Sequence, residues 1–397
     1  MKADNYRVFP IFILAFTRVA TGVAIGLAIP LYLIEIGLNP EIIGFIISGT
    51  AMAYLFSPLI FRNVQKKLGV KPTIILSSLG FLFVQVILQF SKDPLLIYFL
   101  LILDGTFLGL FWPILMGALS AISNSEEYRK NNHLKDKLMK KYSLAWNFGG
   151  IFSYALGFFI LFYIENIQIM FLFALFFAII GFSMALIIQE PSHRFDKEII
   201  ISINEGLKED PQREHISFPL LLPLLMIGIY GFLIGGMGLI YPIKSEILNF
   251  ALFTNYLFFF LRMSTQTISI SKSMDFKIKN TKKMIPISNL LIIFSLFLMG
   301  INQNLFIFAI LFCAFGIFNS FYYTLAFKLI IFRNIANNTS KYSIYFETAI
   351  GIGFFFAPIL CGFIAAVDVN LAFFFLSLLS LLSLVIYLLS KNKIKTN

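Results

Sequence analysis

Charged side chains inside long apolar stretches are the residues of this sequence best suited to chemistry. Arg18, Asp104 and Glu347 each lie within such a stretch. An ionised group at the centre of a bilayer costs about 2.5–3.5 kcal/mol on insertion scales, so each of the three needs a partner, a water-filled cavity or a function. A carboxyl group in that position can take up and release a proton, and a guanidinium can hold an anionic group.

The stretches around these residues are typical of a multi-pass membrane protein. The 397 residues are 59% hydrophobic and only 13% charged, far from the composition of a soluble domain. A helix needs about 20 mostly apolar residues to cross the bilayer core. Twelve such stretches occupy residues 9–32, 41–62, 73–91, 95–121, 142–164, 167–189, 217–242, 247–269, 284–301, 304–330, 342–365 and 369–390. We therefore predict an all-α membrane protein with twelve transmembrane helices, because lipid offers no partner to an unpaired backbone.

Basic residues indicate the orientation of these spans. Lys and Arg gather before the first span, after the second, fourth, eighth and tenth spans, and in the tail, whereas the opposite connections hold only Lys92 and Lys244. By the positive-inside rule we expect both termini in the cytoplasm and the protein in the cell (plasma) membrane. The net charge of +11 follows mostly from this arrangement, so no nucleic-acid partner is expected.

A polar segment divides the chain into two sets of six spans. We expect an N-terminal six-helix bundle at residues 1–190, a cytoplasmic central loop at 191–216 and a C-terminal six-helix bundle at 217–397. The interpretation of residues 199–201 as a short strand or surface segment is less favoured than that of a solvated linker.

Two sequence matches favour a duplicated six-helix unit. KYSLAWN and KYSIYFE open the fifth span of each half, 200 residues apart, so that Asn147 corresponds to Glu347. AYLFSPL and NYLFFFL lie in the second span of each half, 202 residues apart. Either match alone is weak in so apolar a sequence, but two at nearly one offset support an internal repeat.

The order of these features resembles the major facilitator superfamily. The resemblance is carried by the run TRVATGVAIGLAIPLYLIEIGLNPEIIGFIISGTAMAYLFSPLIF, the basic turn KKLGVKPT and the fourth-span run GLFWPILMGALS, and it extends over the whole chain in span number and central loop. It implies two pseudo-symmetric six-helix bundles that rock around a central cavity, with spans 1, 4, 7 and 10 lining the cavity and spans 2, 5, 8 and 11 between the bundles. The family's signature motifs are degenerate here, so the resemblance assigns no subfamily.

The turn after the second span departs from the family pattern. That pattern reads Gly-x-x-x-Asp-Arg-x-Gly-Arg-Lys, and aligning it on Gly69 places Arg62 at the first Gly and Lys66 at the Asp. The resemblance implies that this Asp faces the positive N-terminal end of the eleventh helix, where this chain instead has Glu347. We hypothesise a cytoplasmic gate of inverted polarity, in which Glu347 pairs with Arg62 or Lys66. Two other interpretations stay open: Glu347 as a protonation site, or as a hydrated acid favoured by the helix dipole.

Arg18 and Asp104 lie at similar depth in the first and fourth spans. Their depths differ by roughly 6 Å at a rise of about 1.5 Å per residue, which an arginine side chain can cover. Arg18 shares a helical face with Thr17 and Thr21, a polar stripe suited to a cavity. One interpretation is a fixed ion pair that joins the two helices. The other is that Asp104 binds a proton or Arg18 an anionic group, each competing for the other.

Polar residues of the second half supply further candidates. Tyr230 lies in the seventh span, and Asn319 and Tyr323 lie one turn apart in the tenth, where they either contact a solute in the cavity or only pack. Arg262 and Asn147 lie at similar depth in the eighth and fifth spans. The family architecture would make these two residues neighbours at a bundle interface.

Together these features predict a secondary active transporter that moves a small organic solute by alternating access, coupled to protons through Asp104 or Glu347. The alternatives are an uncoupled facilitator and a non-transporting membrane sensor or scaffold with the same fold. The sequence lacks the nucleotide-binding pattern Gly-x-x-x-x-Gly-Lys-Ser/Thr, and we expect no enzyme activity. Cys313 and Cys361 fall inside spans, so we expect no metal site and no cofactor. The expected partners are the solute, protons and the bilayer, and we expect a monomer.

Overall fold

The computed structural model describes residues 8–61, 64–123, 132–189, 216–276, 278–336, 341–390 and 395–396. Twelve long helices make up nearly all of this part, which confirms the predicted helical class. They are α1 (Phe9–Glu35), α2 (Pro40–Ile60), α4 (Val70–Leu88), α5 (Pro94–Ser123), α7 (Asn132–Tyr163), α8 (Ile169–Ile187), α10 (Leu221–Ile247), α11 (Phe253–Ser273), α12 (Ile278–Ile301), α13 (Leu305–Ala336), α14 (Lys341–Val367) and α15 (Val369–Ser390). A short helix, α3 (Val64–Leu68), precedes α4. Two short strands, β1 (Ile216–Ser217) and β2 (Lys395–Thr396), pair antiparallel.

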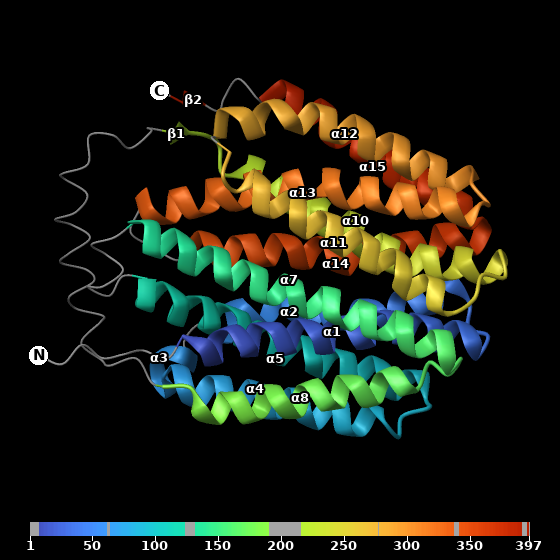
Figure 1. Cartoon of the computed structure of the whole chain (residues 1–397), viewed down its shortest axis with the longest axis horizontal. Coiled ribbons are helices and arrows are strands. Elements are labelled where there is room, and N and C mark those ends of the chain that lie inside the picture. The colour runs from blue at the N-terminus through green and yellow to red at the C-terminus, as the bar shows by residue number, and fades with distance from the viewer. Residues whose placement is uncertain are drawn as a thin grey trace, which may run out of the picture.

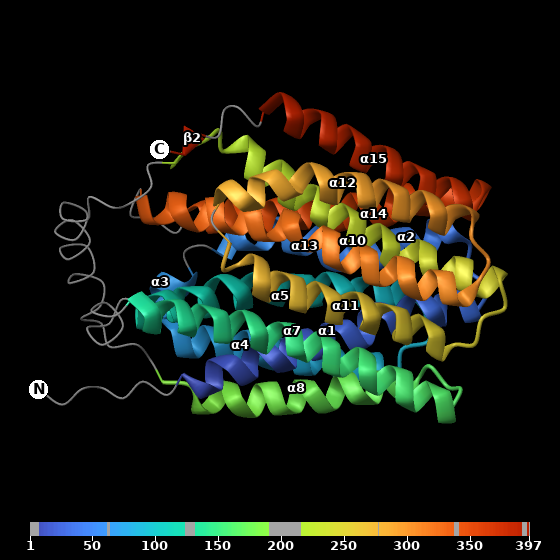
Figure 2. The same ribbon diagram turned by 45° about the horizontal axis from the view of Figure 1, so that its top comes forward.

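The long helices lie side by side along one axis of the molecule (Figure 1). The helices of the first half, α1 to α8, occupy the lower part of the view in Figure 1, and those of the second half, α10 to α15, occupy the upper part. In the turned view, α2 lies beside α14 of the second half (Figure 2). Contacts between the halves run mainly along two seams, one between α2 and α14 and one between α7 and α11. α1 begins and α15 ends at the same end of the molecule, as an even number of crossings requires (Figure 1).

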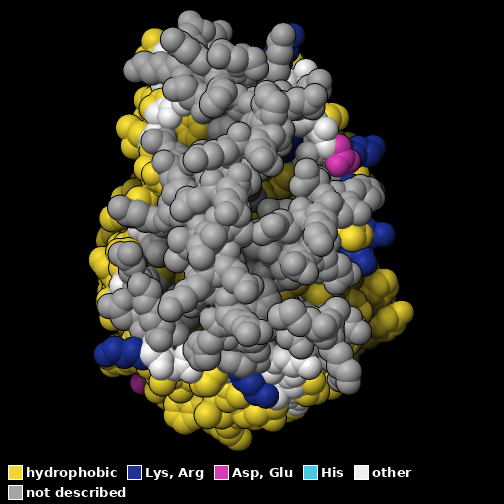
Figure 3. Space-filling model, turned by 90° about the vertical axis from the view of Figure 1, so that its left-hand side faces the viewer, with side chains coloured by type: hydrophobic (Ala, Val, Ile, Leu, Met, Phe, Trp, Pro, Cys, Tyr) yellow, Lys and Arg dark blue, Asp and Glu magenta, His cyan; other side chains and the backbone are white. Residues whose placement is uncertain are grey.

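The outer surface of this helix assembly is apolar. Phe90, Phe306 and Val367 are among many large hydrophobic side chains that are mostly exposed, as expected for residues that face lipid. Of the described helices, eleven are long and apolar enough to cross a membrane. Viewed from the end where α1 begins, the described Lys and Arg side chains lie around the edge of the face among hydrophobic groups (Figure 3).

α11 is the long helix that is too polar to count as a membrane span by composition. Most of its polar side chains are nevertheless buried or half-buried, because they bind neighbouring helices rather than lipid or water. Thr265 donates to the carbonyl oxygen of Cys313 at 3.1 Å, and Ser269 accepts a hydrogen bond from Ser320 at 2.6 Å. In a bilayer such interhelical hydrogen bonds satisfy polar groups that would otherwise be costly.

The loop between α10 and α11 corrects the predicted boundaries of spans seven and eight. We predicted that the seventh span ends at residue 242, but α10 continues to Ile247 with Pro242 inside it. Lys244, predicted to lie in a loop, is therefore a buried helical residue, and it donates to the carbonyl oxygen of Gly300 at 2.9 Å and to Asn370. α11 then begins only at Phe253, after Asn249 has turned the chain with a φ of 52°.

Two glycines allow helices within each half to cross closely. A Cβ on Gly105 of α5 would overlap the carbonyl oxygen of Thr50 in α2. A Cβ on Gly316 of α13 would overlap the carbonyl oxygen of Arg262 in α11 in the same way. Small residues at such crossings let backbones approach and bring the side chains around them together. Both crossings lie next to charged residues discussed below, Asp104 beside Gly105 and Arg262 itself.

Candidate functional site

Arg18 of α1 and Asp104 of α5 form a buried ion pair. Nη2 of Arg18 donates to Oδ2 of Asp104 at 2.7 Å, and their side chains are only 6% and 2% exposed. The guanidinium carbon also lies 3.8 Å from the ring centroid of Phe81 in α4, in cation–π geometry. Because desolvating two charges is costly, such a pair requires good geometry on every remaining polar atom.

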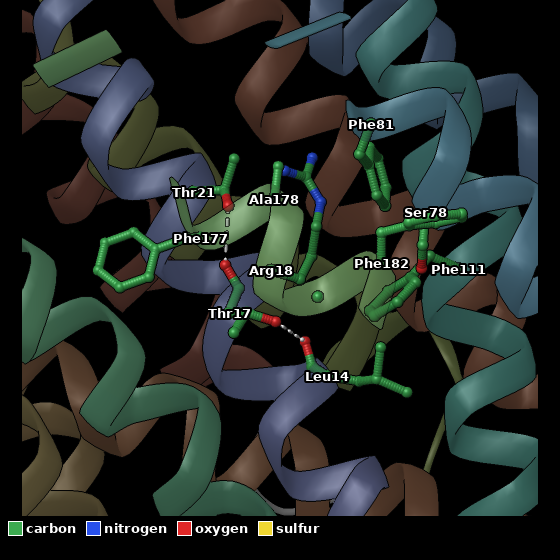
Figure 4. Close-up of a pocket in the computed structure, with 11 residues that line it drawn as sticks. Leu14, Thr17, Arg18, Thr21, Ser78, Phe81, Phe111, Phe177, Ala178 and Phe182 are labelled. Atoms are coloured by element: carbon green, nitrogen blue, oxygen red, sulfur yellow. Dashed lines mark hydrogen bonds between the residues drawn. The ribbon is translucent and has the colours of Figure 1, made fainter. Parts of the chain in front are cut away.

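This pair leaves several of its polar atoms unpaired. Nε and Nη1 of Arg18 and Oδ1 of Asp104 have no hydrogen-bond partner among the described residues. A small cavity of about 20 Å³ lies against Arg18, between α1, α4, α5 and α8 (Figure 4). That volume suits about one water molecule, which would satisfy part of this need.

The polar stripe of α1 faces α8 and this small cavity. Thr17 and Thr21 both line the cavity with Arg18 (Figure 4), and the hydroxyl of Thr21 donates back to the carbonyl oxygen of Thr17 at 2.9 Å. Thr21 also lies 3.5 Å from the carbonyl oxygen of Ala174 in α8. The cavity is therefore internal to the first six helices and is not shared between the two halves.

Glu347 lies at the seam between the halves. The hydroxyl of Tyr54 in α2 donates to its Oε2 at 2.5 Å, and the glutamate, in α14, is only partly buried. In the described ranges Glu347 forms no salt bridge, the two that exist being Arg18–Asp104 and Lys140–Asp275. Arg62 and the side chain of Lys66 lie outside the described residues, so the pairing of the gate stays a prediction.

Asn147 occupies the matching place at the other seam. Its Oδ1 accepts a hydrogen bond from Thr267 of α11 at 3.1 Å, and its Nδ2 donates to the carbonyl oxygen of Ser143 at 2.7 Å. Tyr54 is the fifteenth residue of α2, and Thr267 is the fifteenth residue of α11. The KYSLAWN and KYSIYFE segments thus meet equivalent positions of their partner helices.

The second sequence match does not align the helices in this way. Tyr54 of AYLFSPL lies late in α2, whereas Tyr256 of NYLFFFL is the fourth residue of α11. The hydroxyl of Tyr256 donates to the carbonyl oxygen of Ala24 in α1 at 3.0 Å, far along the seam from Asn147. The likeness of these two apolar segments therefore does not mark equivalent positions.

Arg262 of α11 lies at the α7–α11 seam with Asn147, but the two are not hydrogen-bond partners. Nη1 of Arg262 donates to Oε1 of Gln266 at 3.0 Å, and Nε2 of Gln266 donates to the hydroxyl of Tyr230 at 2.8 Å. The hydroxyl of Tyr154 in α7 also lies beside the guanidinium. The side chain of Arg262 is buried, with 3% of the residue exposed.

Tyr323 of α13 continues this cluster with aromatic rings. Its ring centroid lies 5.5 Å from that of Tyr230 and 6.0 Å from that of Trp146 in α7. Asn319, one turn earlier on α13, is fully buried, and neither its Oδ1 nor its Nδ2 has a partner among the described residues. The structure thus brings Tyr230 and Tyr323 together, and Gln266 links Tyr230 to Arg262. The unpaired amide of Asn319 lies on the same helix as Tyr323.

Several residues of these clusters were not singled out from the sequence, among them Tyr54, Tyr154 and Gln266. Gln266 had a usable signal, because it follows Arg262 at the i+4 spacing that places side chains together on a helix. Tyr54 and Tyr154 had none, since sixteen tyrosines are spread through the chain.

The arrangement is that of a multi-pass membrane transporter: apolar helices in two sets, with buried charges inside one set and at the seams between them. The model of the Major Facilitator Superfamily matches residues 11–272 and 276–396, so the chain belongs to this family of membrane transporters. The resemblance drawn from the sequence is confirmed.

Solved structures of transporters are similar to the whole chain. A bacterial homologue of the human lysosomal transporter Spinster, described as inward-facing and unoccupied, superposes with a TM-score of 0.72 at 12% identity, over 98% of each chain. A structure described under substrate recognition in proton dependent oligopeptide transporters gives 0.70 at 12% identity, over 97% of this chain and 98% of that one. The human organic anion transporter MFSD10 (TETRAN) superposes with a TM-score of 0.66 at 14% identity, over 96% of this chain and 98% of that one. A search of curated protein sequences finds no significant match.

Proposed function

We propose that the protein is a secondary active transporter that moves a small organic solute by alternating access and couples this movement to protons. The observation that carries the proposal is the hydrogen bond between Tyr54 and Glu347 across the α2–α14 seam. A carboxyl group at the junction of the two halves can link its protonation to their separation. The proposal includes the division of the protein into two six-helix bundles and the cytoplasmic location of both termini.

Proton uptake by Glu347 would loosen this seam. A hydrogen bond to an ionised carboxylate is roughly twice as strong as one between neutral groups. Protonation therefore weakens the hold of Tyr54 on Glu347, and it would equally remove an ion pair with Arg62 or Lys66. Both effects favour opening on the side that we expect to be cytoplasmic.

The membrane potential makes one titrating group sufficient for coupling. Moving one charge through 100 mV supplies about 2.3 kcal/mol. By the relation between free energy and equilibrium constant, this corresponds to nearly fifty-fold accumulation of a solute.

The Arg18–Asp104 pair is the second candidate for proton coupling. It lies within the first six helices, so it does not span a seam that opens, which favours the interpretation as a joint between α1 and α5. The unpaired Oδ1 of Asp104 and the adjacent cavity favour the alternative that a proton reaches Asp104 by water.

Proton flux in liposomes tests the proposal. Thermal-shift screening of the purified protein against metabolites first identifies a stabilising solute, and pH-sensitive dye then measures proton entry that depends on that solute. We expect coupled flux in the wild type and in Glu165→Gln, which alters an exposed acid between α7 and α8. Glu347→Gln is expected to move solute without protons. Solute flux without protons in the wild type would make the protein a facilitator, and no solute flux at all would favour a sensor or scaffold.

The conformational part of the proposal has its own measurement. Because Glu347→Gln weakens the closed seam, we expect it to shift the population toward the inward-open state. Labelling of single cysteines placed on each side of the membrane reports this shift as higher accessibility from the cytoplasm and lower accessibility from outside. Unchanged labelling on both sides would show that Glu347 does not hold the seam.

A further inference from the structure

Arg262 is a buried charge that the proposed coupling mechanism does not use. It is the tenth of the 21 residues of α11, so it lies at the middle of the helix. Only 3% of the residue is exposed, and no salt bridge to it occurs within the described ranges. A buried cation without a counter-charge is strongly unfavourable, so the site is incomplete without an anion.

The groups that hold Arg262 are neutral. Gln266 accepts from its Nη1 at 3.0 Å and in turn donates to Tyr230 at 2.8 Å, and the hydroxyl of Tyr154 lies beside it. These contacts orient the guanidinium without neutralising it. Its Nε has no partner among the described residues and remains able to donate. Arg18, by contrast, already has Asp104 as its counter-ion.

Aromatic rings continue from Tyr230, which Gln266 links to this cation. Tyr230 contacts Tyr323, whose ring also lies close to Trp146. Asn319 shares a helical face with Tyr323, one turn away, and is fully buried with both amide atoms unpaired. The cluster draws on α7 from the first half and on α10, α11 and α13 from the second, so a ligand bound here would contact both halves.

We infer that Arg262 is the anion-binding group of the solute site and that the solute is a small organic carboxylate with a flat, apolar body. This inference rests on the proposed transport function and names its substrate class. A carboxylate accepts hydrogen bonds from the planar edge of a guanidinium, and its apolar body packs against Tyr230, Tyr323 and Trp146. The amide of Asn319 is available for a second polar group of the solute.

Access to this site requires the α7–α11 seam to open. In the structure Asn147 and Thr267 join the two helices on one side of Arg262, and Phe158 contacts Phe253 on the other. Alternating access would break these contacts in turn, which exposes Arg262 first to one side of the membrane and then to the other.

Quenching of Trp146 fluorescence tests the inference. The chain has two tryptophans, so Trp112→Phe leaves Trp146 as the only one, beside the proposed site. The probes are three quenchers of one shape and different charge: para-nitrobenzoate, para-nitrobenzamide and para-nitrobenzylammonium. We expect saturable quenching with an apparent Kd for the benzoate at least roughly tenfold lower than for the amide, as one charged hydrogen bond provides.

Variants assign the preference to Arg262. Arg262→Gln is expected to abolish the preference for the benzoate, and Arg262→Lys is expected to keep it with weaker binding, because lysine retains the charge but not the planar fork. The matched control is Lys244→Gln, which removes another buried cation far from the cluster, bound to Gly300 and Asn370, and which should keep the preference. Size-exclusion profiles and melting temperatures identify variants that have not folded.

Three outcomes would overturn the inference: equal binding of the three probes, an anion preference that survives Arg262→Gln, or no saturable quenching by any probe. Failure of the proposed function gives a different result. If the anion preference depends on Arg262 but no solute drives proton entry into liposomes, the site stands and the coupling proposal fails. If a solute drives proton entry but the protein shows no anion preference, the coupling proposal stands and the inference about Arg262 fails.

Discussion

Arg18 and Asp104 stabilise the helices only as a pair. Asp104→Asn leaves the guanidinium of Arg18 buried against Phe81 without its counter-ion. We expect this change to cost about 3–5 kcal/mol of folding free energy, as breaking a buried pair does. The double variant Arg18→Met with Asp104→Leu removes both charges and should recover most of that loss. Melting temperatures in detergent measure the effect.

The same double variant separates the two roles of the pair. If the pair only joins α1 to α5, the double variant retains solute-coupled proton flux. Loss of coupling with retained solute flux would instead assign proton transfer to Asp104. A double variant no more stable than Asp104→Asn would contradict the expected cooperation between the two charges.

At the scale of single residues, the sequence identified the charged residues of the sites better than the neutral residues that bind them. An ionisable residue in an apolar stretch is conspicuous, and depth alone brought Arg18 and Asp104 to a common level, where the structure has their ion pair. Tyr54 and Tyr154 were not predicted, because their partners depend on how each helix is rotated. Helices that are apolar on all sides carry little periodic signal about that rotation.

At the scale of the elements, close helix crossings depend on glycine. Gly105→Ala would place a methyl group on the carbonyl oxygen of Thr50 and force α5 away from α2. Overpacking of this kind costs roughly 1–3 kcal/mol, and the shift would also displace the adjacent Asp104 from Arg18. We expect a lower melting temperature.

Gly26 of α1 provides the matched control for this glycine. A Cβ on Gly26 meets nothing within 4 Å, so Gly26→Ala should be neutral or raise the melting temperature, since alanine favours helix by about 0.5–1 kcal/mol over glycine. Equal melting temperatures for the Gly26 and Gly105 variants would mean that the α2–α5 crossing tolerates an added methyl group.

The helices also differ in how well apolar patterning predicted them: it predicted their existence, but not all of their boundaries. Existence and order of all twelve long helices followed from stretch length, because lipid permits little else. The predicted helix boundaries were wrong where a polar residue lies inside a helix. Lys244 was counted as a loop residue because it is charged, whereas in α10 it is buried against carbonyl oxygen and amide groups of α12 and α15.

At the scale of the whole molecule, the proposed function requires the halves to move relative to each other along their seams. The contacts at these seams come from segments hundreds of residues apart, such as Tyr54 with Glu347. No sequence pattern specifies which conformation of the seams is the one observed. Only the internal repeat indicated that Asn147 and Glu347 occupy corresponding places.

A disulfide across the α2–α14 seam should stop transport. A Cβ on Gly351 would lie 3.4 Å from the Cα of Leu55, so the two backbones are close enough for a disulfide to span. In a background with Cys313 and Cys361 replaced by Ala, we expect Leu55→Cys with Gly351→Cys to crosslink on oxidation and to hold this side of the seam closed. Solute flux in liposomes should fall to the level of empty vesicles and return with reductant.

The matched control is a crosslink within the second half. A Cβ on Gly235 of α10 would lie 3.3 Å from the Cα of Phe354 in α14, so Gly235→Cys with Phe354→Cys joins two helices that move together in the proposed mechanism. This crosslink should leave solute flux intact, because a rigid half loses no motion when it is tied to itself. If both crosslinks stop transport, the helices within a half must also slide past one another. If neither does, the α2–α14 seam does not open during transport, and the role of Glu347 as a gate residue falls with it.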